Sequence, residues 1–232
     1  RLNNFFYSSN FIKTWYYNVY IHMEFLNIIY LNSLSCLTII LNGIAFRKAF
    51  NFENVNKNFL EAGLYGLISI SFITFIANFV FKISNIMSIF ILIIPILFVL
   101  KQIIPKTKEL LLMSILLGLI SSFIMYLDNT NRPDAGLYHL PFINIINDSK
   151  IIIGSANLEF RFGHTSVLQY LSAAFNNNIF SENGILLPQA NIFSIVVLYF
   201  LNLLKVNNTY LKLFFFIFLF NILYSMNRYS GF

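Results

Sequence analysis

The sequence predicts an all-helical membrane protein: a polytopic bundle of transmembrane helices with a large extracytoplasmic loop that contains interfacial helices. Of its 232 residues, 58% are hydrophobic and only 10% are charged, whereas soluble globular domains carry about 25% charged residues. The apolar runs lack the period-two alternation of membrane β-strands. Because backbone amides cannot be left unpaired in lipid, runs that span the membrane must be helical.

Six apolar runs have close to the roughly 20 residues that a helix needs to cross a bilayer. A shorter run, 166–175, is too short to span alone, which leaves three alternatives: a re-entrant segment, an interfacial helix, or the top of a helix that begins earlier. Pro95 predicts a kink in the third run. The organisation expected is N-terminal membrane helices over 1–126, an extracytoplasmic loop over 127–187 and C-terminal membrane helices over 188–232. The six runs are 27–46, 61–81, 84–100, 107–126, 188–204 and 209–226.

The basic residues of the short connections predict the orientation of these runs. Lysine and arginine gather in cytoplasmic loops of membrane proteins. One set of connections is rich in them, and the alternate set offers only Lys82 and Arg228. The rich set therefore faces the cytoplasm, and loop 127–187 faces outside. The residues of the rich set are Arg47, Lys48, Lys57, Lys101, Lys106, Lys108, Lys205 and Lys212.

Composition also narrows the partners and cofactors. The net charge is +6, but the basic residues lie at the ends of apolar runs rather than in a dense patch, so nucleic acid is not expected as a partner. The single cysteine, Cys36, cannot form an intramolecular disulfide. No metal site is expected, and a divalent metal is possible but unsupported. Uncharged amides within the runs fit hydrogen bonds between helices; they are Asn32, Asn42, Asn78, Asn202 and Asn221.

The loop concentrates the rare polar residues of this chain, beginning with Asp134 and His139. Asp134 follows a proline and precedes small residues, so it is a fair N-cap for a short amphipathic helix that Pro141 breaks or bends. The alternative is that Asp134 acts as a general base or metal ligand at the bilayer edge. His139 lies five residues on and so does not share a helical face with Asp134.

In a second cluster, Glu159, Arg161 and His164 alternate with phenylalanines at 160 and 162, and Gly163 interrupts the alternation. One interpretation is an interfacial strand or turn with a surface ion pair of little energetic value. The other takes Arg161 as a phosphate ligand, because its planar guanidinium matches phosphate oxygens, with His164 assisting. The spacing forms no metal motif, no glycine-rich nucleotide loop and no nucleophile elbow.

The segment Asp134-Ala-Gly-Leu-Tyr138-His139, followed by 152–158 and by Arg161-Phe-Gly-His164, resembles bacterial integral membrane glycosyltransferases of the GT-C superfamily. That pattern places an acid, often followed by a tyrosine, in the first large extracytoplasmic loop. The match covers about 40 residues. The chain departs from this pattern in two ways: Ala135 replaces the second acid, and several spans precede the loop where many members of the superfamily have one. The later helices of the family are missing, as expected if the chain is a fragment.

The resemblance implies sugar transfer from a polyprenyl-phosphate-linked donor to a glycan or lipid acceptor outside the bacterial inner membrane, in envelope polysaccharide assembly. It implies that Asp134 is the catalytic base, and that Tyr138, His139, Arg161 and His164 bind substrate. Membrane lipids, the lipid-linked donor and the acceptor are the partners expected. Two alternatives stay open: a polysaccharide polymerase or ligase, and a transporter or scaffold protein without enzymatic activity.

Overall fold

The computed structural model describes residues 25–52, 58–127, 139–157, 162, 166–205 and 208–229. Every element in these ranges longer than an isolated bridge is helical, which confirms the all-helical part of the predicted fold class. All six apolar runs form helices, within a few residues of the expected bounds. These helices are α2 (Phe25–Ala49), α3 (Phe59–Val80), α4 (Asn85–Leu97), α6 (Thr107–Leu127), α9 (Leu187–Leu203) and α10 (Thr209–Tyr229).

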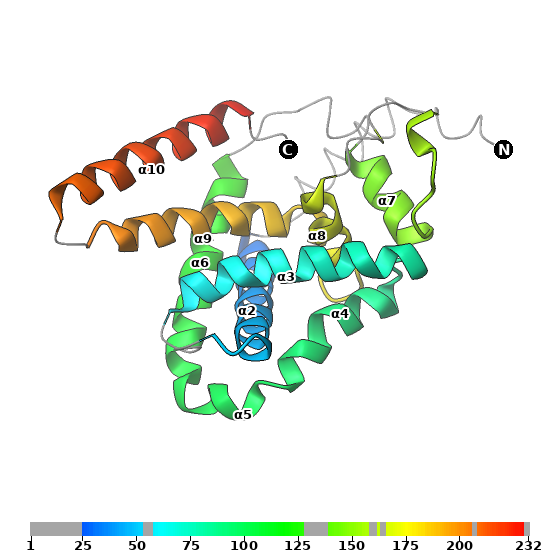
Figure 1. Ribbon diagram of the computed structural model, residues 1–232, viewed down its shortest axis with the longest axis horizontal. Coiled ribbons are helices and arrows are strands. Elements are labelled where there is room, and N and C mark those ends of the chain that lie inside the picture. The colour runs from blue at the N-terminus through cyan, green and yellow to red at the C-terminus, as the bar shows by residue number, and fades with distance from the viewer. Residues whose placement is uncertain are drawn as a thin grey trace.

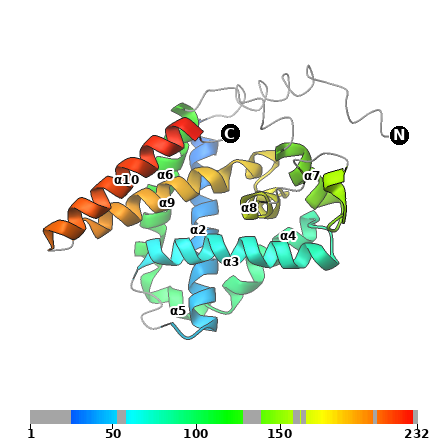
Figure 2. The ribbon, with the colours of Figure 1, turned by 45° about the horizontal axis from the view of Figure 1, so that its top comes forward.

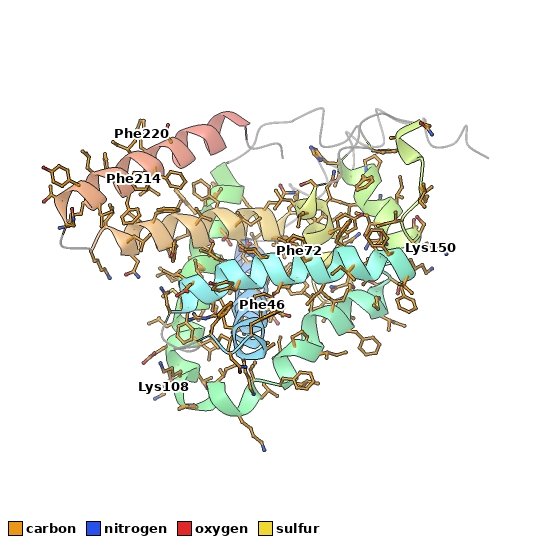
Figure 3. All side chains as sticks on the ribbon, viewed as in Figure 1. Phe46, Phe72, Lys108, Lys150, Phe214 and Phe220 are labelled. Carbon is orange, nitrogen blue, oxygen red and sulfur yellow. The ribbon has the colours of Figure 1, made fainter. Side chains whose placement is uncertain are left out.

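Three of these helices are long and apolar enough to cross a membrane: segments 26–49, 59–80 and 107–126 of α2, α3 and α6. They indicate an integral membrane protein. Shorter apolar helices lie in 85–97, 187–203 and 209–221. Outward-facing phenylalanines such as Phe72, 49% exposed, suit a lipid environment (Figure 3).

The helices cross one another steeply instead of running side by side as in an up-and-down bundle. In Figures 1 and 2, α2 and α6 run alongside each other, while α3 and α9 lie across them. Glycines permit the closest crossing: a Cβ built on Gly43 of α2 would overlap the backbone carbonyl of Ala62, and one on Gly66 of α3 would overlap that of Ile39. Small residues of this kind let membrane helices pack backbone to backbone.

Pro95 interrupts the third predicted run, and helix α4 ends early. The predicted run 84–100 becomes α4, which stops two residues after Pro95, and a separate single turn, α5 (Leu100–Ile103). The interruption follows from the proline, which lacks an N–H for the helical ladder and clashes with the preceding turn. A 3-10 turn, η2 (Ile104–Lys106), then leads into α6.

The short run 166–175 forms α8 (Val167–Phe175). A capping box between Ser166 and Gln169 begins this helix, which rules out the alternative that it continues a helix starting earlier. From Gln169 to Phe175 every residue is buried, and the helix lies among α3, α7 and α9 (Figure 2). α8 is therefore part of the protein interior.

The helix ends divide between two sides of the molecule. The end of α2, the start of α3 and α5 lie toward the lower left of Figure 1, and the end of α9 and the start of α10 lie at its left edge. The α3–α4 turn, α7 (Leu140–Asp148) and α8 lie toward the right. We call the first the basic side and the second the α7–α8 side. Labelled lysines mark both: Lys108 lies on the basic side and Lys150 on the α7–α8 side (Figure 3).

Candidate functional site

Helix α7 begins later than the sequence suggested. His139 occupies its N-cap position and Pro141 lies in its first turn. Proline is favoured there because the first helical N–H groups have no intrahelical partner and its fixed φ suits the helix. Pro141 was expected to break or bend a helix starting near Asp134; the residues before His139 that would test this lie outside those described, and within α7 Pro141 belongs to the first turn. Asp134 lies outside the described residues, and it is not the N-cap of α7.

The amphipathic pattern of α7 is confirmed. Phe142, Ile143 and Ile146 are buried, whereas Asn144 and Asp148 are exposed. The buried face packs on protein, since α7 contacts α8. An expected surface helix is thus anchored to the core along one side, which gives the loop that precedes it a fixed point of attachment.

Asn147 fastens α7 to two other elements. Its Nδ2 donates to the carbonyl of Ile83 at 2.8 Å and to that of Ala173 at 3.0 Å. Its Oδ1 accepts from Nδ2 of Asn176 at 2.9 Å. The amide is fully used, and it joins α7 to the α3–α4 turn and to the end of α8. This role could not be predicted from the sequence, where Asn147 is one more polar residue of an amphipathic helix.

Asn78 makes a second set of such contacts from the end of α3. Its Nδ2 lies 3.0 Å from the Ser149 carbonyl and 3.3 Å from that of Ile146. Its own carbonyl accepts from the backbone N–H of Ile151 at 3.0 Å. Asn78 is 1% exposed, so no water can replace these carbonyls as partners of its amide. These bonds hold the end of α7 against α3.

His139 and Gln169 join the first turns of α7 and α8. Gln169 Oε1 accepts from the Ser166 N–H at 3.1 Å in the capping box. Its Nε2 lies 3.1 Å from His139 Nδ1. Because the Gln169 oxygen is already identified by the Ser166 contact, the facing atom is the amide nitrogen, and it donates. Nδ1 of His139 therefore accepts, and the ring carries its proton on Nε2.

The sequence assigned five site residues to this loop, and the structure describes one of them, His139. Asp134, Tyr138, Arg161 and His164 lie outside the described residues. Phe162, which follows Arg161 in the chain, has its ring centroid 5.7 Å from that of Phe142 in α7. Among the described residues, both loop segments are thus attached near the start of α7, one through His139 and the other through Phe162.

Burial also affects Tyr170 in α8. It is 2% exposed, and its ring meets Phe75 edge to face at 5.0 Å between centroids. Burial raises the pKa of the Tyr170 hydroxyl above its ordinary value, because the phenolate is poorly solvated there. Tyr170 is a neutral packing residue at the base of this region.

The opposite side holds a charged pair that the sequence did not reveal. Arg47, in the last turn of α2, is 4% exposed and lies 3.6 Å from the Glu61 carboxylate in the first turn of α3. Its guanidinium also lies 5.8 Å from the ring centre of Tyr65. A buried arginine needs such partners to offset its desolvation. From the sequence, Arg47 was identified only as a topology-setting charge. The signal that could have predicted the pair is Glu61, an acid that follows Arg47 across a short connection.

Hydrogen bonds between helices use several of the amides singled out by sequence. Asn32 donates to Ser122 at 3.0 Å, joining α2 to α6, and Asn42 donates to the Leu92 carbonyl at 2.9 Å, joining α2 to α4. The prediction is confirmed for these and for Asn78. Asn221 instead donates to the Ile217 carbonyl within α10.

Serines and one further asparagine of this interface were missed. Asn191 of α9 donates to Ser35 of α2, and the hydroxyls of Ser121 and Ser194 lie 2.8 Å apart between α6 and α9. All four side chains are buried. They form a polar seam at the centre of the crossing helices. In the part of the chain that the structure describes, no three His, Cys, Asp or Glu side chains gather as a metal site would require.

Together these features describe an all-helical membrane protein in which a small module of two helices, α7 and α8, is hydrogen-bonded to one side of the crossing apolar helices. Residues 23–230 match the family described as a domain of unknown function, DUF8201. The chain belongs to that family. It matches no curated protein and no solved structure.

Proposed function

We propose that the protein is a membrane glycosyltransferase that moves a sugar from a polyprenyl-phosphate-linked donor to a glycan or lipid acceptor outside the bacterial inner membrane. The observation that carries the proposal is the hydrogen bond between His139 and Gln169. Segments 128–138 and 163–165, which contain Asp134 and His164, attach to the chain directly beside His139 and Ser166 respectively. One bond therefore joins the two polar segments at their points of attachment.

The distribution of charge supports an external location for this module. Arg47, Lys48, Lys101 and Lys108 lie at helix ends of the basic side, while the α7–α8 side is poorer in basic residues among those described. Cytoplasmic connections carry the excess of lysine and arginine. The loop that contains α7 and α8 then faces outside, where a lipid-linked sugar presents its phosphate at headgroup depth.

The proposed chemistry is a single displacement at the anomeric carbon. The Asp134 carboxylate takes the proton of the acceptor hydroxyl as its oxygen attacks that carbon. The bond from the anomeric carbon to the phosphate oxygen breaks, and the polyprenyl phosphate leaves with the bonding electrons. Arg161 stabilises the negative charge on the departing phosphate. Tyr138, His139 and His164 orient donor and acceptor.

The test measures release of polyprenyl phosphate from a polyprenyl-phosphate-linked radiolabelled hexose by protein reconstituted with membrane lipid extract as the acceptor source. Asp134→Asn should lower the rate by about 10²–10⁴-fold, the usual contribution of a general base. Asp148→Asn is the matched control, because Asp148 is an exposed acid of the same loop, and its rate should stay within about twofold of the wild type.

A positioning role for the α7–α8 junction is tested in the same assay. Gln169→Leu removes the donor to His139 and the acceptor of the capping box, and should raise the KM for the donor lipid more than it lowers kcat. Gln169→Glu keeps the capping acceptor, so it separates loss of the cap from loss of the histidine contact. An unchanged KM in both variants would remove the junction from the proposal.

The competing functions predict different outcomes. Donor consumption that lengthens an existing glycan by whole repeat units would indicate a polymerase or ligase. No donor consumption by the wild-type protein with any hexose or pentose donor would overturn the enzyme proposal in favour of a transporter or scaffold. Within the described residues, the Arg47–Glu61 pair lies at helix ends, whereas a proton-coupled transporter is expected to carry ionisable groups deeper in its spans.

A further inference from the structure

Lysines surround the turn between α4 and α6 on the basic side. Lys101 of α5 and Lys108 of α6 are exposed, and Lys106 of η2 is half-buried between them. Lys48, at the end of α2, reaches across and donates to the Phe98 carbonyl at 2.8 Å. This bond brings the end of α2 against the α4–α5 junction, so that lysines from distant parts of the chain occupy one surface.

Large apolar side chains project from the same surface. Phe98 is 72% exposed, Leu97 60% and Leu100 48%. Apolar groups so exposed next to lysines are costly in water, whereas at the boundary of a bilayer they enter the acyl region. Lysine stems lie along apolar surface while the ammonium groups reach the headgroups. Exposed apolar side chains beside lysines are typical of a protein surface that lies at the depth of the lipid headgroups.

We infer that this surface, formed by Lys48, Lys101, Lys106, Lys108 and the neighbouring Phe98, binds the headgroups of anionic phospholipids. The described acids near it are Glu109, in the first turn of α6, and Glu61, which pairs with the buried Arg47. The lysines therefore outnumber the acids that could neutralise them. Phosphate-bearing headgroups supply the missing negative charge.

The α7–α8 side provides the comparison. Lys82 and Lys150 are both exposed there, but Lys82 follows α3 and Lys150 follows α7, next to the exposed Asp148. Figure 3 shows Lys150 and Lys108 on different sides of the molecule. Removing two lysines from either side changes the net charge of the protein equally. Any difference in lipid binding between two such variants therefore reports the surface and not the total charge.

The experiment uses the full chain purified in an uncharged detergent and titrated with phosphatidylglycerol, with retained lipid counted by native mass spectrometry. Each lysine near a headgroup contributes roughly fivefold in affinity, so Lys101→Gln with Lys108→Gln should weaken phosphatidylglycerol binding roughly 25-fold. Lys82→Gln with Lys150→Gln should leave it within about twofold. Phosphatidylcholine should bind all three proteins equally.

Two results would overturn the inference. Equal loss of phosphatidylglycerol binding in both double variants would mean that only net charge matters. Displacement of phosphatidylglycerol by millimolar inorganic phosphate would identify a local site for small anions instead of a lipid surface. Both double variants keep all apolar packing residues, and a matching elution profile in size-exclusion chromatography verifies that each remains folded.

Discussion

The crossing of α2 and α3 at Gly43 and Gly66 offers the sharpest test of the fold. A Cβ built on Gly43 would lie 2.6 Å from the Ala62 carbonyl carbon and 2.7 Å from the Gly66 nitrogen, and would overlap the Ala62 oxygen. Non-bonded carbon contacts are about 3.5–4.0 Å. Because the obstructing atoms are backbone, no side-chain rotation can relieve the overlap, and Gly43→Ala must push the two helices apart by at least about 1 Å.

A separation of that size removes a quarter to a half of the attraction of each close contact. Overpacking substitutions in well-packed interiors cost about 1–3 kcal/mol. The rigid obstruction here places Gly43→Ala at or above the upper end, about 3 kcal/mol. Gly63→Ala, on the partner helix α3, is the control: its Cβ would lie 3.2 Å from the Ile195 side chain, which can shift, so we expect a loss below about 1 kcal/mol.

The measurement is the unfolding of both variants in mixed micelles titrated with sodium dodecyl sulfate, followed by far-ultraviolet circular dichroism. Gly43→Ala should shift the midpoint to clearly lower denaturant fraction, and Gly63→Ala should shift it little. A shift of the same size in both variants would refute the reasoning, since the helices would then not be in backbone contact at Gly43.

Two further predictions concern α7 and α8. Asn78→Leu removes the Asn78 donor from the Ser149 carbonyl and one of two donors from the Ile146 carbonyl, which keeps its bond from the Ile83 N–H. We therefore expect about 1–3 kcal/mol less stability, the cost of one unsatisfied group, and faster hydrogen exchange confined to the end of α7; uniform acceleration over the whole chain would contradict this. Burial raises the pKa of Tyr170, so the folded state holds this proton more tightly than the unfolded chain. Stability should therefore be unaffected below about pH 10, the ordinary tyrosine pKa, and should fall as pH rises above it. Tyr170→Phe should remove that decline, and a decline of equal slope in both proteins would assign it to other groups.

The helices themselves were readable from sequence because they depend on local properties. Six apolar runs became six helices. Pro95 was expected to kink its run, and α4 instead ends two residues after it, which its missing N–H explains. Amides such as Asn32 were correctly assigned to hydrogen bonds between helices, because an amide among apolar residues needs a hydrogen-bond partner and neighbouring helices supply one. The role of Pro141 could not be settled from sequence because proline both begins and interrupts helices; the structure places it in the first turn of α7, after His139 at the N-cap.

What the sequence determined by itself is the class of protein: apolar length and scarcity of charge allow only a helical membrane protein, because lipid leaves no other partner for the backbone. Tertiary structure alone decided which groups meet. The crossing at Gly43, the pair of Arg47 with Glu61 and the bond of His139 to Gln169 each join residues from different helices. Periodicity describes one helix at a time, so it carries no information on the angle or level at which two helices cross.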